Sequence, residues 1–417
     1  MRAKDETYVI RVDKDTYVSN STMGPMPVRI KPWPRHPQYG VRELHEIAKV
    51  LESGILSGYR GTPEGHKGGK KVQELQSFFE SYLGVKHAVA FNSATAALHA
   101  ACVCCGVGYG DEVIVSPYTF SSSASCAMMA NGVPVFVDID PEIFCITAEN
   151  IEKAITPRTK AVIPVHLAGH PCDMDAIMEV AKKYNIKVIE DSAQCLGGTY
   201  KGRQTGTIGD IGIYSFNQSK PVSTGEGGMF VTNNDEYARM ARAIMNHGEV
   251  SDPSAGVVGY NYRMTEMVAA IALEGMRSLD KMNDIRIDLT SYMTEFLNTL
   301  DGFTPPVTKF WSKHVFYTYM VKVTSDRISR NDFQKAMMGE GIYFGSGYVT
   351  PLYLYPIYHE KAPPQVRASG VNYDKGLCPV AERMFEKELV CTDILRFPAT
   401  KSDVDDVIKA IRKVLNV

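Results

Sequence analysis

The chain has 417 residues and a formal net charge of −2; 44% of its residues are hydrophobic and 22% are charged. This composition is typical of a soluble globular protein with two or three domains, and it gives no electrostatic basis for binding nucleic acid or an anionic membrane. Nine cysteines in a chain of this length do not form a disulfide framework, and no Cys-x-x-Cys pair has a matching second pair, so we expect free thiols and no metal site. No apolar run approaches the roughly 18 residues of a membrane span, and the N-terminus is polar, so a cytoplasmic protein is expected.

Residues 1–40 are expected to form an irregular N-terminal extension. The segment 23–37 contains too many prolines for a helix or a central strand, so we expect it to lie over a surface, while residues 8–12 could form an edge strand. A helix is then predicted from Val41 until Gly54 stops it. The apolar residues on one of its faces are Val41, Leu44, Ile47, Ala48 and Leu51.

A glycine-rich and mostly basic loop covers residues 58–70. It lacks the Gly-Lys-Ser/Thr ending of a Walker-type phosphate loop and does not follow a strand, so that kind of site is rejected. The glycines at 106–110 follow a helix rather than a strand, so they are not a dinucleotide fingerprint either.

From Val72 the pattern alternates regularly between helices and short strands. The predicted strands are continuous apolar runs, as expected when helices cover both faces of a sheet. They cover residues 87–91, 112–115, 134–138, 161–165, 187–191 and 211–216. The fold class is therefore α/β, with a large domain at residues 41–279 built on a mostly parallel sheet, in which ligands bind at the carboxyl ends of the strands.

The C-terminal third is predicted to form a smaller α+β domain, residues 280–417. A long amphipathic helix is expected to begin at Asp280 and to run to about Leu300, leading out of the large domain. Strand 316–321 and helices at about 330–339 and 402–415 follow it.

A lysine and a carboxylate follow two of the predicted strands. Strand 211–216 leads into a tight, glycine-bordered loop that carries Lys220, and strand 187–191 ends at Asp191. Pyridoxal phosphate needs a lysine amine for its aldehyde and a carboxylate for its ring nitrogen, so the pair suits this cofactor. On these two strands alone, a solvated loop lysine remains the alternative.

Other strand ends offer partners for the phosphate and the ring of such a cofactor. Residues 92–96 join a strand to a helix, whose free N–H groups form an anion site, although Ser93 and Thr95 could be simple N-caps. Ser215 could add a hydroxyl to the same phosphate. Phe120 is a candidate for stacking on the ring, with ordinary core packing as its alternative. Gln194 could bond the ring hydroxyl.

These motifs together resemble the DegT/DnrJ/StrS aminotransferases, which are fold-type I pyridoxal phosphate enzymes that act mostly on keto sugars. The resemblance covers about residue 40 to the C-terminus, in order and at the family's spacings. It is carried by residues 92–98, 111–115, 164–169, 190–194, 220, 224–228 and 259–264.

The resemblance implies that Lys220 is the Schiff-base lysine, that Asp191 pairs with the pyridine nitrogen and that Gln194 contacts the ring oxygen. It assigns the phosphate to Ser215, Ala94 and Thr95 and the stacking role to Phe120. The full set of expected cofactor-binding residues is Ser93, Ala94, Thr95, Phe120, His166, Asp191, Gln194, Ser215, Asn217, Lys220 and Asn261, of which Lys220 and Asp191 are catalytic.

A homodimer is also implied, because the family's asparagine that matches Asn261 reaches the phosphate of the neighbouring subunit. His166 matches a family position near the cofactor, although a lone strand-end histidine would otherwise be read as structural. The chain departs from the family pattern at Ala94, where glycine is usual, and at residues 217–219, which replace a proline-containing lead-in to the lysine.

The expected function is transfer of an amino group from glutamate or glutamine to a keto sugar, nucleotide-linked, in surface-polysaccharide or natural-product biosynthesis. The long N-terminal extension with Trp33-Pro34 also resembles members that act on cyclitols, aminobenzoates or octulosonates. Sugar dehydratases of the same fold carry histidine at the lysine position, so Lys220 argues against dehydration. A non-catalytic sensor of pyridoxal phosphate would be expected to lack Lys220 or Asp191.

Overall fold

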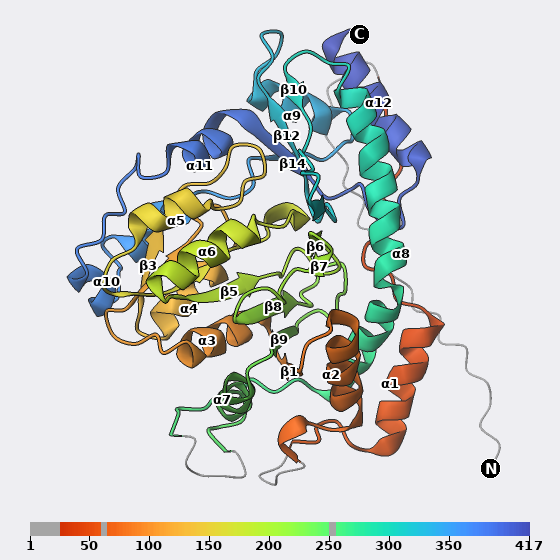
Figure 1. Ribbon diagram of the computed structural model, residues 1–417. Coiled ribbons are helices and arrows are strands. Elements are labelled where there is room, and N and C mark those ends of the chain that lie inside the picture. Colours follow the sequence, from red (N-terminus) through yellow and green to blue (C-terminus); the bar gives the residue numbers. More distant parts are fainter. Residues whose placement is uncertain (1–25, 60–64, 250–255) are drawn as a thin grey trace, which may run out of the picture.

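The computed structural model describes residues 26–59, 65–249 and 256–417, so the strand expected at residues 8–12 lies outside the described residues. A seven-stranded sheet forms the centre of the fold, and a separate four-stranded sheet lies above it in the view of Figure 1. None of the described helices is long and apolar enough to cross a membrane.

The larger sheet has the strand order β1-β9-β8-β5-β4-β2-β3. Its strands are β1 (His87–Phe91), β2 (Glu112–Val115), β3 (Val133–Phe136), β4 (Thr159–Ile163), β5 (Lys187–Asp191), β8 (Ile211–Ser215) and β9 (Gly228–Thr232). Neighbouring strands from β3 to β8 are parallel, whereas β9 runs antiparallel to both β8 and β1. The prediction of an α/β fold on a mostly parallel sheet is confirmed, and β9 is a strand that the sequence pattern did not reveal.

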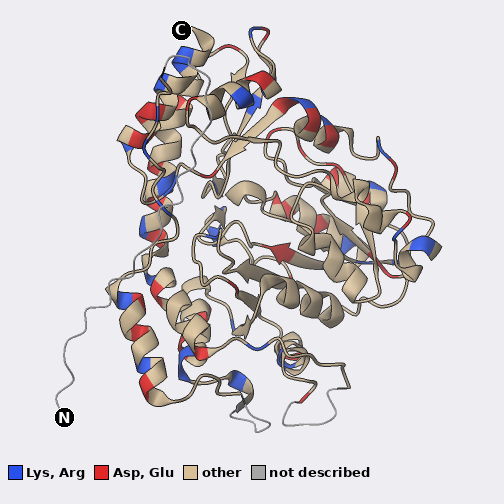
Figure 2. Cartoon of the chain, turned by 180° about the vertical axis from the view of Figure 1, so that it is seen from behind, with Lys and Arg blue, Asp and Glu red and all other residues tan. Residues whose placement is uncertain are grey.

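Helices cover both faces of this sheet, which explains why its strands are apolar on both sides. In Figure 1, α3 and α4 lie on one face and α5 and α6 on the other. The helices of this part are α1 (Val41–Ser53), α2 (Lys70–Leu83), α3 (Ala94–Cys104), α4 (Ser122–Met129), α5 (Ala148–Ala154), α6 (Met174–Tyr184) and α7 (Asp235–Met245). Figure 2 shows the charged residues mainly on the outer helices and loops, whereas the central strands are almost free of them.

Helix α8 (Glu266–Leu297) connects the two sheets. Leu273 and Met276, in its first half, pack into a core shared with α2 and β1, and Leu289 and Met293, in its second half, pack under the smaller sheet. The helix begins 14 residues before the predicted start at Asp280. Its first half is apolar on several sides because it is buried there, so the amphipathic pattern becomes visible only after Asp280.

The smaller sheet is antiparallel, with the order β10-β12-β14-β13. Its strands are β10 (Phe303–Thr304), β12 (Tyr319–Val323), β13 (Gly345–Ser346) and β14 (Leu389–Thr392), and α9 (Arg330–Gly339) and α12 (Lys401–Leu415) pack against it. We call these elements the small unit. The strand predicted at 316–321 begins later because Phe316 has a φ of 47°, which extended backbone does not allow.

Shorter elements complete the described structure. A three-stranded sheet is formed by β6 (Thr199–Tyr200), β7 (Arg203–Gln204) and β11 (Ser312–Lys313), in the order β11-β6-β7. The connection between β13 and β14 contains α10 (Pro364–Ala368), α11 (Pro379–Arg383) and a π-helical turn at Met384–Glu388. Backbone N–H groups of α11 donate to Asp138, which follows β3, so this connection is fastened to the larger sheet.

Residues 26–40 contain no helix or strand and lie on the small unit. The buried Arg29 side chain donates to Asp403 and Asp406 of α12, at 2.9 Å each, and its guanidinium carbon lies 3.8 Å from the ring centre of Trp33. We call residues 26–40 the N-terminal strap. It continues directly into α1.

Candidate active site

Lys220 lies in the loop that follows β8, and only 9% of its surface is exposed. The loop is closed by a hydrogen bond from Gln218 N–H to the Gly225 carbonyl oxygen, at 2.9 Å. The amine nitrogen of Lys220 lies 4.3 Å from the ring centre of Tyr317, whose hydroxyl is 2.9 Å from Ser219 Oγ. Lys220 is therefore a buried amine on an aromatic face, not a solvated loop lysine.

Two basic side chains hold the outer side of this loop. The Arg396 guanidinium donates to the Ser219 carbonyl oxygen at 3.2 Å, and a ring nitrogen of His36 lies 3.5 Å from the Lys220 carbonyl oxygen. Burial lowers the pKa of His36 to about 4, and the positive charges of Arg396 and Arg286 lower it in the same direction. His36 is therefore neutral at neutral pH, and the N-terminal strap reaches the lysine loop without adding charge.

Asp191 ends β5, beside β8, where it pairs in register with Ile213. It is 4% exposed; Ser123 Oγ donates to its Oδ2 at 2.7 Å, and the Ala193 N–H donates to its Oδ1 at 3.1 Å. A carboxylate has about four lone-pair positions, so two donors leave it able to accept from a protonated ring nitrogen. Ser123 is a site residue that the sequence analysis missed.

The proposed phosphate seat lies at the start of α3. Ser93 caps this helix by accepting from the Ala96 N–H at 3.1 Å, so its hydroxyl has the N-cap role that was left open. Within the described residues, the N–H groups of Ala94 and Thr95 donate to no protein acceptor, as is usual for the first turn of a helix. The register places Ser215 opposite Gly228, which in turn touches this helix start.

The Gln194 side chain has a defined orientation. Its Oε1 accepts from the Ala168 N–H at 2.8 Å, so its Nε2 is the donor end, and it donates to the Tyr348 hydroxyl at 2.9 Å. An amide nitrogen carries two protons. One therefore remains for a ring oxygen, the contact expected of Gln194.

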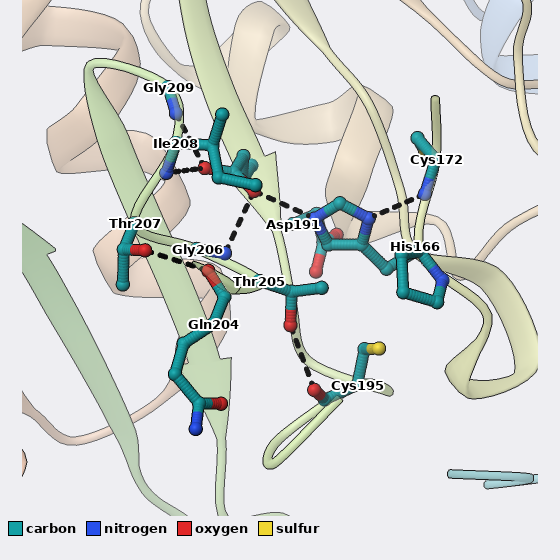
Figure 3. Close-up of polar contacts among 12 residues, drawn as sticks. His166, Cys172, Asp191, Cys195, Gln204, Thr205, Gly206, Thr207, Ile208 and Gly209 are labelled. Carbon is teal, nitrogen blue, oxygen red and sulfur yellow. Dashed lines mark hydrogen bonds and ion pairs between the residues drawn. The ribbon is translucent and has the colours of Figure 1, made fainter. Parts of the chain in front are cut away.

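His166 is fully buried, and both of its ring nitrogens are used within the protein (Figure 3). Its Nδ1 accepts from the Cys172 N–H at 3.0 Å, so its Nε2 carries the proton and donates to Glu190 Oε2 at 3.0 Å. Glu190 also accepts backbone N–H groups of the loop after β7, namely those of Gly206, Ile208 and Gly209. His166 therefore has no polar atom left for a cofactor, and a cofactor contact of this residue stays a prediction.

Three further expected site residues are placed by the structure as follows. Asn217 shapes the lysine loop, because its Nδ2 donates to Glu226 Oε1 at 3.1 Å and its Oδ1 accepts from Ser219. Asn261 is exposed, and its Oδ1 accepts from Arg263 at 3.0 Å. Phe120 is 62% exposed, so its ring is not in the core and stacking on a cofactor stays a prediction.

The groups at these strand ends fit pyridoxal phosphate. Lys220 offers a buried amine, Asp191 a buried carboxylate acceptor and Gln194 an amide donor, and the start of α3 offers unused N–H groups for a dianion. Among the described residues, no group of three or more His, Cys, Asp or Glu side chains is arranged to hold a metal ion.

Comparison with known proteins gives consistent results. The chain is 36% identical over 357 residues to the GDP-perosamine synthase of Caulobacter vibrioides, covering 83% of this chain and 91% of that protein. It is 34% identical over 400 residues to the spore coat polysaccharide biosynthesis protein SpsC of Bacillus subtilis, covering 91% and 96%. Its fold is similar to the X-ray structure of an aminotransferase from Psychrobacter cryohalolentis, with a TM-score of 0.83, 30% identity and coverage of 92% and 99%.

The model of the DegT/DnrJ/EryC1/StrS aminotransferase family matches residues 42–412, which is most of the chain. Together with the strand-end lysine and carboxylate, this match shows that the chain belongs to the DegT/DnrJ/EryC1/StrS family of pyridoxal phosphate-dependent aminotransferases.

Proposed function

We propose that this chain binds pyridoxal phosphate and transfers an amino group from glutamate or glutamine to a nucleotide-linked keto sugar. The observation that carries the proposal is a pair of buried groups at the ends of adjacent strands: the amine of Lys220, in the loop after β8, and the hydrogen-bonded carboxylate of Asp191, at the end of β5. The relatives named above support a sugar acceptor, since one is a GDP-perosamine synthase and another is a spore coat polysaccharide biosynthesis protein. A role in surface-polysaccharide or natural-product biosynthesis follows.

Bound pyridoxal phosphate supplies an aldehyde that captures amines and a ring that withdraws electrons from the carbon next to the amine. Lys220 would hold the cofactor and, once a substrate amine has displaced it, would move a proton at the substrate carbon through its Nζ. Asp191 would keep the ring nitrogen protonated. Ser215 and the N–H groups of Ala94 and Thr95 would bind the phosphate, and Phe120 would cover the ring and exclude water from it.

Lys220 also separates the proposal from its alternatives. A pyridoxamine-dependent dehydratase needs a residue other than lysine here, because a lysine amine competes with the substrate for the cofactor. A non-catalytic sensor needs neither a proton shuttle nor a ring-nitrogen partner, yet both Lys220 and Asp191 are in place and buried.

We also propose that two copies assemble as a homodimer, in which Asn261 reaches the neighbouring active site. Support comes from α1, whose apolar side faces outward and whose buried side carries Glu46 and Val50. The exposed fractions are 82% for Val41, 66% for Leu44 and 58% for Leu51. We call Val41, Leu44, Ala48 and Leu51 the α1 stripe; spacings of three and four residues align them along one side of the helix.

A helix normally buries its apolar side, so the α1 stripe indicates a covering partner. A second copy is the partner that the cross-subunit role of Asn261 requires. Three residues of the apolar face predicted for α1, namely Val41, Leu44 and Leu51, thus lie at the surface.

The function is tested by loading the purified chain with pyridoxal phosphate and supplying glutamate or glutamine with a nucleotide-linked keto sugar. We expect visible absorption from the loaded protein, a change in that absorption with the amino donor, and an amino sugar detected by mass spectrometry. A cyclitol ketone and a keto-octulosonate are offered in parallel. If the chain aminates one of these and not the sugar, the acceptor belongs to that class instead. A chain that binds no cofactor would refute the proposal.

A further inference from the structure

We propose that Tyr348, a residue of the small unit, donates its phenol proton to the ring oxygen of bound pyridoxal phosphate, and that Gln194 is the positioning residue that orients it. The inference rests on the proposed function, because it requires that the cofactor binds. It adds a binding residue that the family resemblance did not indicate.

Tyr348 follows β13 and reaches from the small unit to the strand ends of the larger sheet. Its backbone N–H donates to the Tyr118 hydroxyl at 2.8 Å, and the two rings meet edge to face with their centres 6.0 Å apart. Burial raises the pKa of its phenol, and Tyr317 and Asp191 raise this pKa further. Tyr348 therefore sits among the groups assigned to the cofactor ring.

The direction of each hydrogen bond shows that the phenol proton of Tyr348 is unused. The Ala168 N–H can only donate, so it fixes Gln194 Oε1 as the acceptor and Gln194 Nε2 as the donor. The Tyr348 oxygen accepts from that Nε2 at 2.9 Å. No described residue accepts the Tyr348 proton, and burial raises the pKa of Tyr348, so the phenol keeps this proton at working pH.

The half-buried phenol has a proton that no described residue accepts, so it can donate to a ligand oxygen at this place. Gln194 Nε2, which is hydrogen-bonded to the Tyr348 hydroxyl, still has one unused proton. The amide of Gln194 and the phenol of Tyr348 can therefore both donate to one ligand oxygen. They suit an oxygen that carries negative charge, as the ring oxygen of pyridoxal phosphate does. Because the Tyr348 oxygen already accepts from Gln194, its own proton is polarised and becomes a better donor.

Two ligands distinguish a hydrogen bond from Tyr348 to the ring oxygen from a purely structural role of Tyr348. Pyridoxal phosphate has the ring oxygen, whereas 3-deoxypyridoxal phosphate lacks it and keeps the aldehyde, the ring nitrogen and the phosphate. We would measure the affinity of the cofactor-free chain for each ligand by equilibrium dialysis, for the natural sequence and for Tyr348→Phe. Because Tyr348→Phe removes one hydrogen bond, its affinity for pyridoxal phosphate should fall about five- to tenfold. Its affinity for the deoxy ligand should fall less than about twofold.

Tyr118→Phe is the matched control, because it removes a buried phenol oxygen that contacts the backbone of Tyr348 and not Gln194. If Tyr118→Phe displaces the segment that carries Tyr348, it should weaken binding of both ligands equally. The ratio of its two affinities should therefore equal that of the natural sequence. Equal weakening of both ligands by Tyr348→Phe, or no weakening of either, would overturn the inference while leaving the proposed function intact. If the natural sequence binds neither ligand, the proposed function fails as well.

Discussion

Gly228 on β9 touches the first turn of α3 so closely that a Cβ atom at position 228 would lie 2.5 Å from the Ala94 backbone nitrogen. Real Cβ atoms do not approach backbone this closely, so a side chain here must displace the helix start. The close packing of β9 against α3 therefore requires glycine at position 228. It lets the strand beside Ser215 and the N–H groups proposed to bind phosphate meet at one place.

Gly228→Ala should consequently weaken pyridoxal phosphate binding by more than tenfold and lower the free energy of unfolding by about 1–3 kcal/mol, the usual cost of overpacking. Cofactor titration and chemical denaturation measure the two effects. Gly339→Ala, at the end of α9, is the control, because nothing lies within 4 Å of its added Cβ. Normal cofactor affinity in Gly228→Ala would show that the phosphate lies elsewhere.

Lys220→Ala should abolish amino transfer while the chain stays folded, because the amine forms no hydrogen bond or ion pair with a described residue and lies over the Tyr317 ring. Turnover with glutamate and a keto sugar measures the first effect, and the melting temperature measures the second. Lys160→Ala removes an exposed lysine from β4 and should retain full activity. Transamination that survives in Lys220→Ala would assign the chemistry to another lysine.

The sequence pattern predicted those strands whose structure depends mainly on neighbouring residues. Strands 87–91 and 112–115 were predicted with their observed bounds, because continuous apolar runs between turn residues leave few other structures. Asp191 ends β5 and Lys220 lies in the loop after β8; these strands are parallel neighbours, so the sequence could place both groups at the same end of the sheet.

The rest of the site depends on contacts that no local pattern reveals. Ser123 is separated from Asp191 by 68 residues, and Tyr348 from Gln194 by 154 residues. Neither side chain lies in a motif that distinguishes it from other serines and tyrosines of the chain. His166 is the reverse case, since its motif suggested a cofactor contact whereas Glu190 and the Cys172 N–H occupy both of its nitrogens.

The N-terminal strap should be held by the charge of Asp403. Burial disfavours ionisation of this carboxyl, but hydrogen bonds from Thr400, Arg29 and Lys31 outweigh it and lower the pKa of Asp403 from 3.8 to about 2. A lowered pKa stabilises the fold at pH values above the unfolded value of 3.8, and this contribution disappears as the pH falls through 2. Its size is about 2 kcal/mol at neutral pH.

Arg29→Met should therefore destabilise the chain by about 2–4 kcal/mol at pH 7, where it leaves a buried carboxylate with fewer partners, and by clearly less near pH 2. Chemical denaturation at the two pH values tests this. Lys31→Met is the control: its side chain is 57% exposed, so its ion pair with Asp403 should contribute less than about 1 kcal/mol. An equal loss in Arg29→Met at both pH values would mean that packing on Trp33, not charge, holds the strap.

We expect the α1 stripe to form the interface of the proposed dimer. Replacing Leu44 and Leu51 with glutamine in one variant leaves the buried side of α1 untouched, because Glu46 and Val50 face the other way. If a second copy covers the stripe, two buried polar amides should disfavour association by several kcal/mol in total and shift the chain from dimer to monomer. Light scattering after gel filtration measures the mass.

Glu52→Gln, which changes an exposed polar residue of the same helix, should leave the mass unchanged. If the dimer also forms the active site, the double variant should lose cofactor affinity along with its partner, and Asn261→Ala should lose affinity without loss of the dimer. A double variant that stays dimeric would place the interface elsewhere. A natural chain that is monomeric and still binds pyridoxal phosphate normally would exclude the cross-subunit role of Asn261, because no neighbouring active site would then exist for it to complete.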